Sequence, residues 1–227
     1  MLIDHWPLLG LELVTPRLTL RLPTPEELAV LADLASQGVH DPATMPFSSG
    51  WTDLPASERA RSVIQQQWRR QGEWKPEHWS LNLAVFEDGH PVGSQALAAK
   101  RFRLVREVSS ASWLGREYQG RGIGTEMRAA VLHLAFERLE AVSAVTGAFT
   151  DNEPSLAVSH KLGYRDDGFE RRVVRGDVVI MQRLRLPRSE WNPEFSRGMR
   201  ITGLTPCLPL FGLSGDDGSA DQSRDRV

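Results

Sequence analysis

The stretch Gln119-Gly120-Arg121-Gly122-Ile123-Gly124 decides how the centre of this chain is interpreted. Before it, residues 108–114 are small, β-branched and aromatic, which predicts a strand. After it, apolar residues recur at helical spacing, at Ile123, Met127, Val131 and Leu134. A glycine-rich turn at the head of a helix presents unpaired backbone N–H groups at the positive end of the helix dipole. The stretch therefore predicts a binding site for a phosphate or pyrophosphate.

Composition sets the broad class of the protein. The 227 residues are enough for one well-buried domain with an appendage. A formal net charge of −2 argues against electrostatic binding of nucleic acid. The single cysteine, Cys207, excludes an intrachain disulfide and is typical of a reducing compartment. Because the chain also shows no secretion signal and no apolar run of membrane-spanning length, we expect a cytoplasmic protein without a membrane partner.

Hydrophobic periodicity divides the chain into strands and helices. Thr24 followed by Glu27 is the signature of a helix start, and Asp88-Gly89 between two strand-like runs indicates a tight hairpin. The long connection 38–50 is of a length that is often functional. The expected strands are 17–22, 79–86, 91–99, 108–114, 141–149, 164–174 and 177–186, and the expected helices are 25–36, 56–71, 123–134 and 154–162.

The pattern weakens after residue 187, which suggests three segments. Residues 1–190 are expected to form the main domain. Residues 191–212 form a C-terminal extension in which 199–211 predicts an edge strand, a place where copies of the chain could pair as a homo-oligomer. Residues 213–227 are small, polar and charged, and predict a disordered tail.

The glycine stretch alone leaves several interpretations open. It could be a strand-to-helix turn without a ligand. It nearly fits the dinucleotide motif Gly-x-Gly-x-x-Gly, but that motif belongs to an early βαβ unit, and here the loop follows an antiparallel hairpin past the middle of the chain. The P-loop signature is absent, since no Gly-Lys-Ser/Thr follows.

Two motifs together carry a family resemblance over residues 17–186. Gln119-x-x-Gly122-x-Gly124 resembles the acyl-CoA pyrophosphate loop of the GNAT superfamily, the Gcn5-related N-acetyltransferases. Asn152-x-x-Ser155, followed by Lys161-Leu162-Gly163-Tyr164, resembles that family's second signature. The resemblance implies an α+β fold: a mixed, twisted sheet of six to seven strands with about four helices, in which parallel strands four and five splay apart.

Within the superfamily, the start Thr15-Pro16-Arg17-Leu18-Thr19-Leu20-Arg21 is similar to that of ribosomal-protein alanine acetyltransferases. A closer similarity is to a small actinobacterial group, which implies a succinyl rather than an acetyl donor. The segments that carry this second similarity are His5-Trp6-Pro7-Leu8, Gly38-Val39-His40-Asp41-Pro42, Met45-Pro46-Phe47 and Pro209-Leu210-Phe211-Gly212.

The resemblance also implies which residues bind acyl-CoA. The backbone of Trp113 and Leu114 would pair with pantetheine. Arg121 would add a bond to phosphate or lie exposed on the helix, and Asn152 would hold the pantetheine or stabilise the helix start. The pyrophosphate would rest on the N–H groups of Gln119, Gly120, Arg121, Gly122, Ile123, Gly124 and Thr125.

The catalytic residues are less determined. Many members use a tyrosine as general acid where this chain has Ser159, so Ser155 is the expected substitute unless it only contributes to the first helical turn. Glu107 and His40 are candidates for the general base. Glu107 could equally be a solvated strand-end carboxylate, and His40 could shape a turn. The histidines show no metal-ligand spacing, so we expect no metal.

These observations predict an acyl-CoA-dependent N-acyltransferase. It would move an acetyl or succinyl group to a primary amine by direct attack in a ternary complex. The amine could belong to a small molecule, a protein N-terminus or a lysine. The alternative is a non-catalytic acyl-CoA sensor with the same fold. The tryptophans expected near the acceptor are Trp51, Trp68, Trp74 and Trp79.

Overall fold

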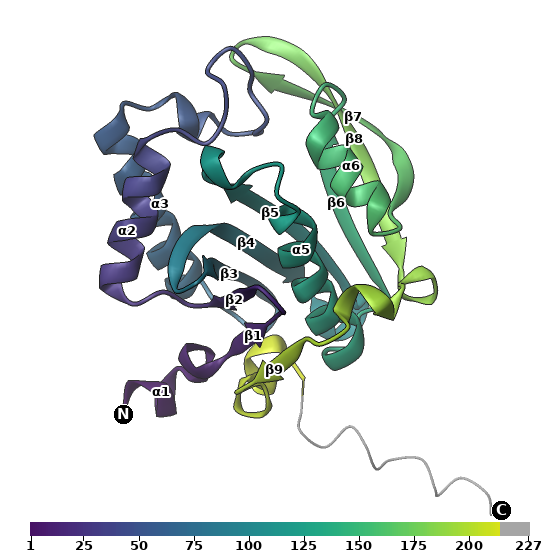
Figure 1. The fold of residues 1–227 in the computed structure, drawn as a ribbon. Helices are drawn as coiled ribbons and strands as arrows, with labels where there is room; N and C mark the ends of the chain where they lie inside the picture. Colours follow the sequence, from purple (N-terminus) through teal and green to yellow (C-terminus); the bar gives the residue numbers. More distant parts are fainter. Residues whose placement is uncertain (214–227) are drawn as a thin grey trace, which may run out of the picture.

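The computed structural model describes residues 1–213, which form a single mixed sheet with helices on both faces (Figure 1). Within these residues the sheet has nine strands in the order β7-β8-β6-β5-β4-β3-β2-β1-β9. The strands are β1 (Glu12–Val14), β2 (Leu18–Arg21), β3 (His78–Glu87), β4 (His90–Lys100), β5 (Glu107–Leu114), β6 (Ser143–Phe149), β7 (Arg165–Val174), β8 (Asp177–Pro187) and β9 (Arg200–Thr202).

Helix α2 begins where the sequence predicts it. In α2, the Thr24 hydroxyl accepts a hydrogen bond from the Glu27 N–H and the Glu27 carboxylate accepts one from the Thr24 N–H, the reciprocal cap expected from the sequence. Arg21 holds the same carboxylate through two bonds of 2.7 Å. The helices are α1 (Leu2–His5), α2 (Pro25–Ser36), α3 (Ala56–Gly72), α4 (Phe102–Val105), α5 (Ile123–His133) and α6 (Glu153–Lys161).

Alternate side chains of β3 point to opposite faces of the sheet, and each face is packed against a different hydrophobic cluster. Leu83 and Val85 belong to the main core, which also contains the apolar side of α5. The alternate residues Ala84 and Phe86 point to the opposite face, where they pack with α2. Helix α5 packs over the middle of the sheet (Figure 1). Because only a short connection joins β5 to α5, the first residues of the helix lie near the end of β5.

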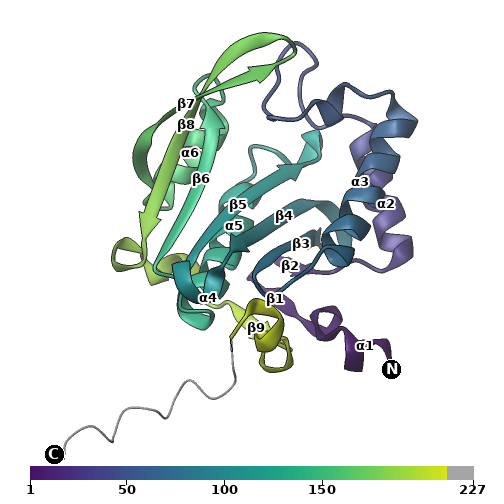
Figure 2. The ribbon, with the colours of Figure 1, turned by 180° about the vertical axis from the view of Figure 1, so that it is seen from behind.

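The parallel pair β5 and β6 creates the opening that the resemblance implies. The two strands are paired over only three positions, from Glu107 opposite Ser143 to Ser109 opposite Val145. Beyond these positions β5 follows β4 and β6 follows β8, so the strands diverge (Figure 2). The α+β fold with splayed parallel strands is therefore confirmed, although the sheet is wider than six to seven strands because β1 and β9, of three residues each, extend one edge.

The two ends of the described chain meet in an aromatic cluster. Trp74 lies 6.0 Å from Trp6, 5.9 Å from Trp79 and 5.6 Å from Phe211 between ring centroids. Its indole N–H donates to the Leu210 carbonyl at 2.8 Å. Trp74 and Trp79 therefore pack with both ends of the described chain, and their place near the acceptor stays a prediction.

The Trp68 side chain is 65% exposed on α3. Except for Leu213, the predicted disordered tail at 213–227 lies outside the described residues. None of the helices in residues 1–213 is long and apolar enough to cross a membrane.

Candidate active site

The glycine loop presents a set of backbone donors at the start of α5. Gly120 and Gly122 have φ of +72° and +80°, a region that glycine enters without a steric penalty. Gly122 caps the helix without a side-chain hydrogen bond. Within residues 1–213, the N–H groups of 120–125 have no hydrogen-bond acceptor. These donors, together with the helix dipole, form a surface suited to an anion.

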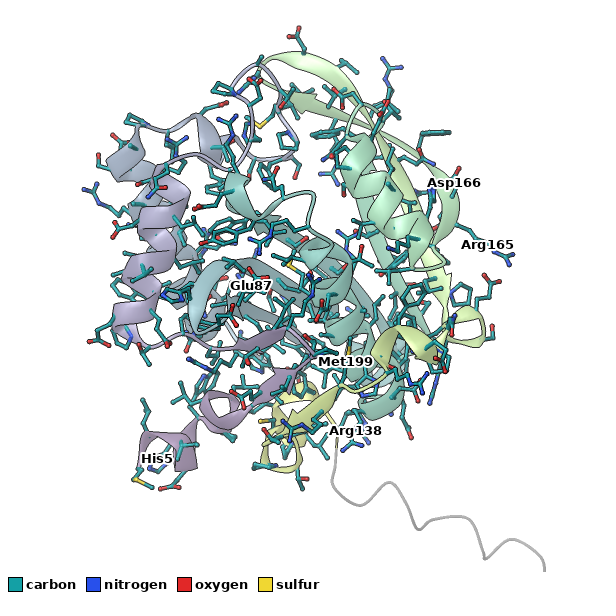
Figure 3. All side chains as sticks on the ribbon, in the orientation of Figure 1. His5, Glu87, Arg138, Arg165, Asp166 and Met199 are labelled. Atoms are coloured by element: carbon teal, nitrogen blue, oxygen red, sulfur yellow. The ribbon has the colours of Figure 1, made fainter. Side chains whose placement is uncertain are left out.

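Ion pairs of Arg17 and Arg121 connect this loop to β3, to α5 and to the segment before β2. The Arg17 Nε and Nη2 atoms hold the Glu126 carboxylate at 2.7 and 2.6 Å, and its Nη1 donates to the Arg121 carbonyl at 3.1 Å. Thr15 donates to the same carboxylate at 2.6 Å. Arg121 pairs with Glu87 at 2.8 Å, at the end of β3 (Figure 3). Sequence reasoning missed the support from Arg17 and Glu126, because their contact joins positions 109 residues apart.

Gln119 connects the loop to two other segments. Its amide nitrogen donates to the Val39 carbonyl at 2.7 Å and to the Leu114 carbonyl at 3.0 Å. Leu114 ends β5, and Val39 lies near the start of the long connection between α2 and α3. The structure therefore brings the expected donor residues of 113–125 to one place, and it joins them to the segment that contains His40.

The second signature lies at the start of α6. The Asn152 side chain accepts a hydrogen bond from the Ser155 N–H at 3.3 Å, so Asn152 is the N-cap of this helix. Ser155 is half-buried in the first turn. Ser159 is fully buried, and its hydroxyl donates to the Ser155 carbonyl at 2.9 Å. The helix follows β6, on the far side of the opening from β5 (Figure 1).

An aromatic row connects His40 to the end of β5. Centroid distances are 5.7 Å from His40 to Phe47, 5.3 Å from Phe47 to Trp51 and 5.8 Å from Trp51 to Trp113. The His40 Nδ1 atom is 2.7 Å from the Asp41 carbonyl, so in the neutral ring it carries the proton. The buried Nε2 atom then has a free lone pair, with no partner within residues 1–213.

The same long connection also contacts the β7–β8 hairpin. Arg175, at the hairpin tip, bonds both oxygens of Asp53, which also lowers the pKa of this carboxyl group. Farther along β7, Arg165 and Asp166 lie at the outer side of the molecule (Figure 3). The hairpin tip and the connection therefore meet across the open end of the sheet.

Glu107 lies apart from the other candidates. It starts β5 where the strand is still paired with β6, about 20 Å along the strand from Trp113. Its carboxylate accepts hydrogen bonds from the Arg185 guanidinium and, at 2.8 Å, from the Ser143 hydroxyl. The structure therefore brings His40, Trp113 and the glycine loop together but leaves Glu107 at the closed end of the opening.

Residues 17–165 match the family model described as an acetyltransferase (GNAT) domain, and this match covers more than half of the chain. The chain therefore belongs to the GNAT acetyltransferase family. Among curated proteins, the "Putative ribosomal N-acetyltransferase YdaF" of Bacillus subtilis is 27% identical over 159 residues, which cover 70% of this chain and 83% of that protein.

Solved structures show the same fold. RimL, a ribosomal L7/L12 alpha-N-protein acetyltransferase in complex with coenzyme A, superposes with a TM-score of 0.63 at 16% identity, covering 77% of this chain and 96% of RimL. RimJ of Mycobacterium smegmatis, in complex with a CoA disulfide, has a TM-score of 0.63 at 18% identity, covering 81% of this chain and 90% of RimJ. The predicted GNAT fold is thus confirmed.

Proposed function

We propose that this protein is an acyl-CoA-dependent N-acyltransferase that transfers an acetyl or succinyl group to a primary amine. The observation that carries this proposal is the set of unpaired N–H groups at 120–125, placed where β5 and β6 diverge. The pyrophosphate binds these donors, and the pantetheine enters the opening beside Trp113 and Leu114. The single cysteine, Cys207, agrees with a cytoplasmic location.

The proposed reaction needs one base and one acid. His40 Nε2 takes one proton from the ammonium form of the amine, and the neutral nitrogen attacks the thioester carbonyl. The new C–N bond forms and the C–S bond breaks as the departing thiolate takes a proton from the Ser155 hydroxyl. The second proton of the attacking nitrogen passes through solvent to Ser155 and restores its hydroxyl, and His40 releases the first proton to solvent. Because the Glu107 carboxylate is held by Arg185 and Ser143, we assign Glu107 to fixing the β5–β6 pair rather than to catalysis.

For the acceptor, we propose the N-terminal amine of a ribosomal protein. The names of YdaF and RimL support this choice, since they describe a ribosomal N-acetyltransferase and a ribosomal L7/L12 alpha-N-protein acetyltransferase. The aromatic row from His40 to Trp113 forms the wall along which the amine approaches. Small-molecule amines and protein lysines are the competing acceptors.

A non-catalytic acyl-CoA sensor is the second candidate. Ser159 favours it, because this residue replaces the tyrosine of many family members, and its hydroxyl is buried and donates a hydrogen bond to the Ser155 carbonyl.

Calorimetric titration with CoA tests the donor site. We expect CoA to bind, and neither ATP nor NAD to compete with it. ATP binding without CoA binding contradicts the donor assignment.

Turnover separates the enzyme from the sensor. The protein is incubated with acetyl-CoA or succinyl-CoA and an amine panel, and free thiol is measured. The panel contains N-terminal peptides of ribosomal proteins, the same peptides with blocked N-termini and an internal lysine, and small amines. Thiol release that requires the free N-terminus supports the proposal. Release at the level of hydrolysis for every amine supports the sensor.

A further inference from the structure

One arginine joins the two sides of the opening. Arg175 lies at the tip of the β7–β8 hairpin, and its guanidinium bonds the Asp53 carboxylate at two points, through Nε at 3.0 Å and through Nη2 at 2.5 Å. The same guanidinium lies 3.4–3.5 Å from the Pro42 carbonyl. Pro42 and Asp53 belong to opposite ends of the connection between α2 and α3, so a single side chain contacts both ends.

The other polar contacts of this connection come from its own side of the opening. Gln119, in the loop after β5, donates to the Val39 carbonyl, and Arg59 on α3 donates to the Thr52 carbonyl at 2.9 Å. Arg175 instead comes from the strands that cover β6, and both views show the hairpin tip beside the connection (Figures 1 and 2). In the part of the chain that the structure describes, no other side-chain hydrogen bond joins the connection to this hairpin.

The backbone of the turn gives no reason for an arginine. The β7–β8 and β3–β4 hairpins both have two-residue turns with positive φ, at +53° and +89° in Arg175-Gly176 and at +49° and +78° in Asp88-Gly89. Such turns favour Asn, Asp or Gly at the first position. A left-handed arginine costs free energy there, so any contribution of Arg175 comes from its side chain.

The connection contains residues that the proposed function uses. Trp51, two residues before Asp53, belongs to the aromatic row that reaches the end of β5. His40 lies two residues before Pro42. The pKa of Asp53 is lowered first by its hydrogen bond from Arg175 and then by the charges of Arg175 and His40, so His40 lies within electrostatic reach of the pair. Holding both ends of the connection therefore restricts where His40 and Trp51 can lie.

We propose that Arg175 is a positioning residue: through Asp53 it holds the connection across the open end of the sheet and so fixes His40 and the aromatic row beside β5. This inference rests on the proposed function. The side chains of the pair are 37% and 38% exposed, and exposed ion pairs are weak, so the pair can open when an acceptor enters and then re-form. The two-point geometry sets the orientation of the connection as well as its distance from the hairpin.

Arg175→Asn breaks the pair without weakening the turn, because Asn is favoured at this position. We expect kcat/KM for a ribosomal-protein peptide with a free N-terminus to fall about 3- to 10-fold, while the Kd for CoA changes by less than about twofold. The urea midpoint should not fall. Asp88→Asn, at the equivalent position of the β3–β4 turn, is the matched control and should keep the wild-type kcat/KM.

Exchanging the two charges tests the pair itself. Arg175→Asp and Asp53→Arg each place like charges opposite one another, so each should lower kcat/KM, and the double variant should recover most of the loss. Arg175→Asp also suits the turn, since Asp tolerates the left-handed conformation. Arg175→Lys keeps the charge but loses the two-point geometry, and it should lie between the wild type and Arg175→Asn.

Hydrogen exchange measures the effect of the pair without an acceptor. In Arg175→Asn the backbone N–H groups of residues 38–53 should exchange faster than in the wild type, and those of β5 and α5 should not change. This readout remains if the wild type shows no turnover with any amine. Absence of turnover would refute the proposed function, whereas the exchange of 38–53 would still decide whether Arg175 holds the connection.

Either of two results in Arg175→Asn would overturn the inference. Unchanged exchange at 38–53 would mean that Arg175 does not hold the connection. Unchanged kcat/KM in a protein that turns over would mean that holding the connection does not position the reacting groups. A double charge-exchange variant no more active than the weaker single variant would also contradict it, because Arg175 would then act without Asp53.

Discussion

Replacing Gly122 by alanine separates the role of the glycine loop in folding from its role in binding. Gly122 has a φ of +80°, and the nearest atom to an added Cβ is Arg17 Nη2 at 3.5 Å. The substitution therefore causes no severe clash inside the protein. Its two costs are the left-handed backbone conformation and the new methyl group on the surface that faces the anion.

The magnitudes of the two costs differ. An alanine in the left-handed region costs about 1–2 kcal/mol, which lowers the free energy of unfolding by that amount. If the loop relaxes to a negative φ, at least one N–H group of 120–125 turns away from the pyrophosphate. Loss of one hydrogen bond to a charged group costs about 1.5–3 kcal/mol, or roughly 10- to 150-fold in the Kd for CoA.

The assay pairs urea denaturation with calorimetric titration of CoA, and Gly198→Ala is the matched control. Gly198 has a φ of +76°, and the nearest atom to its added Cβ is Pro16 Cγ at 3.7 Å. Both variants should lose similar stability, but only Gly122→Ala should lose affinity for CoA. Equal CoA affinities in the two variants, within twofold, would refute the assignment of the loop to the pyrophosphate.

Three further predictions concern titration and catalysis. The pKa of Glu27 is lowered to about 2, chiefly by its hydrogen bond from Arg21, so its contribution to stability is complete above the unfolded pKa of about 4.3 and is lost as pH falls through about 2. Glu27→Gln should flatten that acid loss in urea titrations, and an unchanged slope would contradict this. Burial raises the pKa of Cys207 to about 11, so its thiol should resist an aromatic disulfide reagent in the native protein, and Cys207→Ala should keep full turnover. His40→Ala should lower kcat by about 10²–10⁴-fold with CoA affinity unchanged, whereas Glu107→Gln should mainly lower the unfolding midpoint; the reverse pattern would exchange their roles.

Local signals in the sequence predict the elements around the site. The pair Thr24 and Glu27 marks the start of α2, and Asp88-Gly89 marks the β3–β4 turn, because each acts within four residues. The glycine loop is predicted for the same reason, since a strand, a turn and a helix follow one another along the chain.

Contacts between distant residues are not visible in these patterns. Arg128 looks like an ordinary helical arginine until α6 places Ser159 beside it. Trp74 and Phe211 meet only because the C-terminal segment packs against the residues between α3 and β3. The left-handed Arg101 and Arg106 around α4 carry no glycine signal, so the sequence does not reveal this short helix.

The order of strands also limits where the chain can be truncated for expression. The family match ends at residue 165, yet β6 is covered by β8, which begins at Asp177 and pairs with it over seven residues. At the other end, the match begins after β1, the strand that covers β2. A fragment trimmed to 17–165 would expose two strand edges and invite intermolecular pairing. The segment that matches the family model is therefore shorter than the segment that must be expressed to keep both strand edges covered.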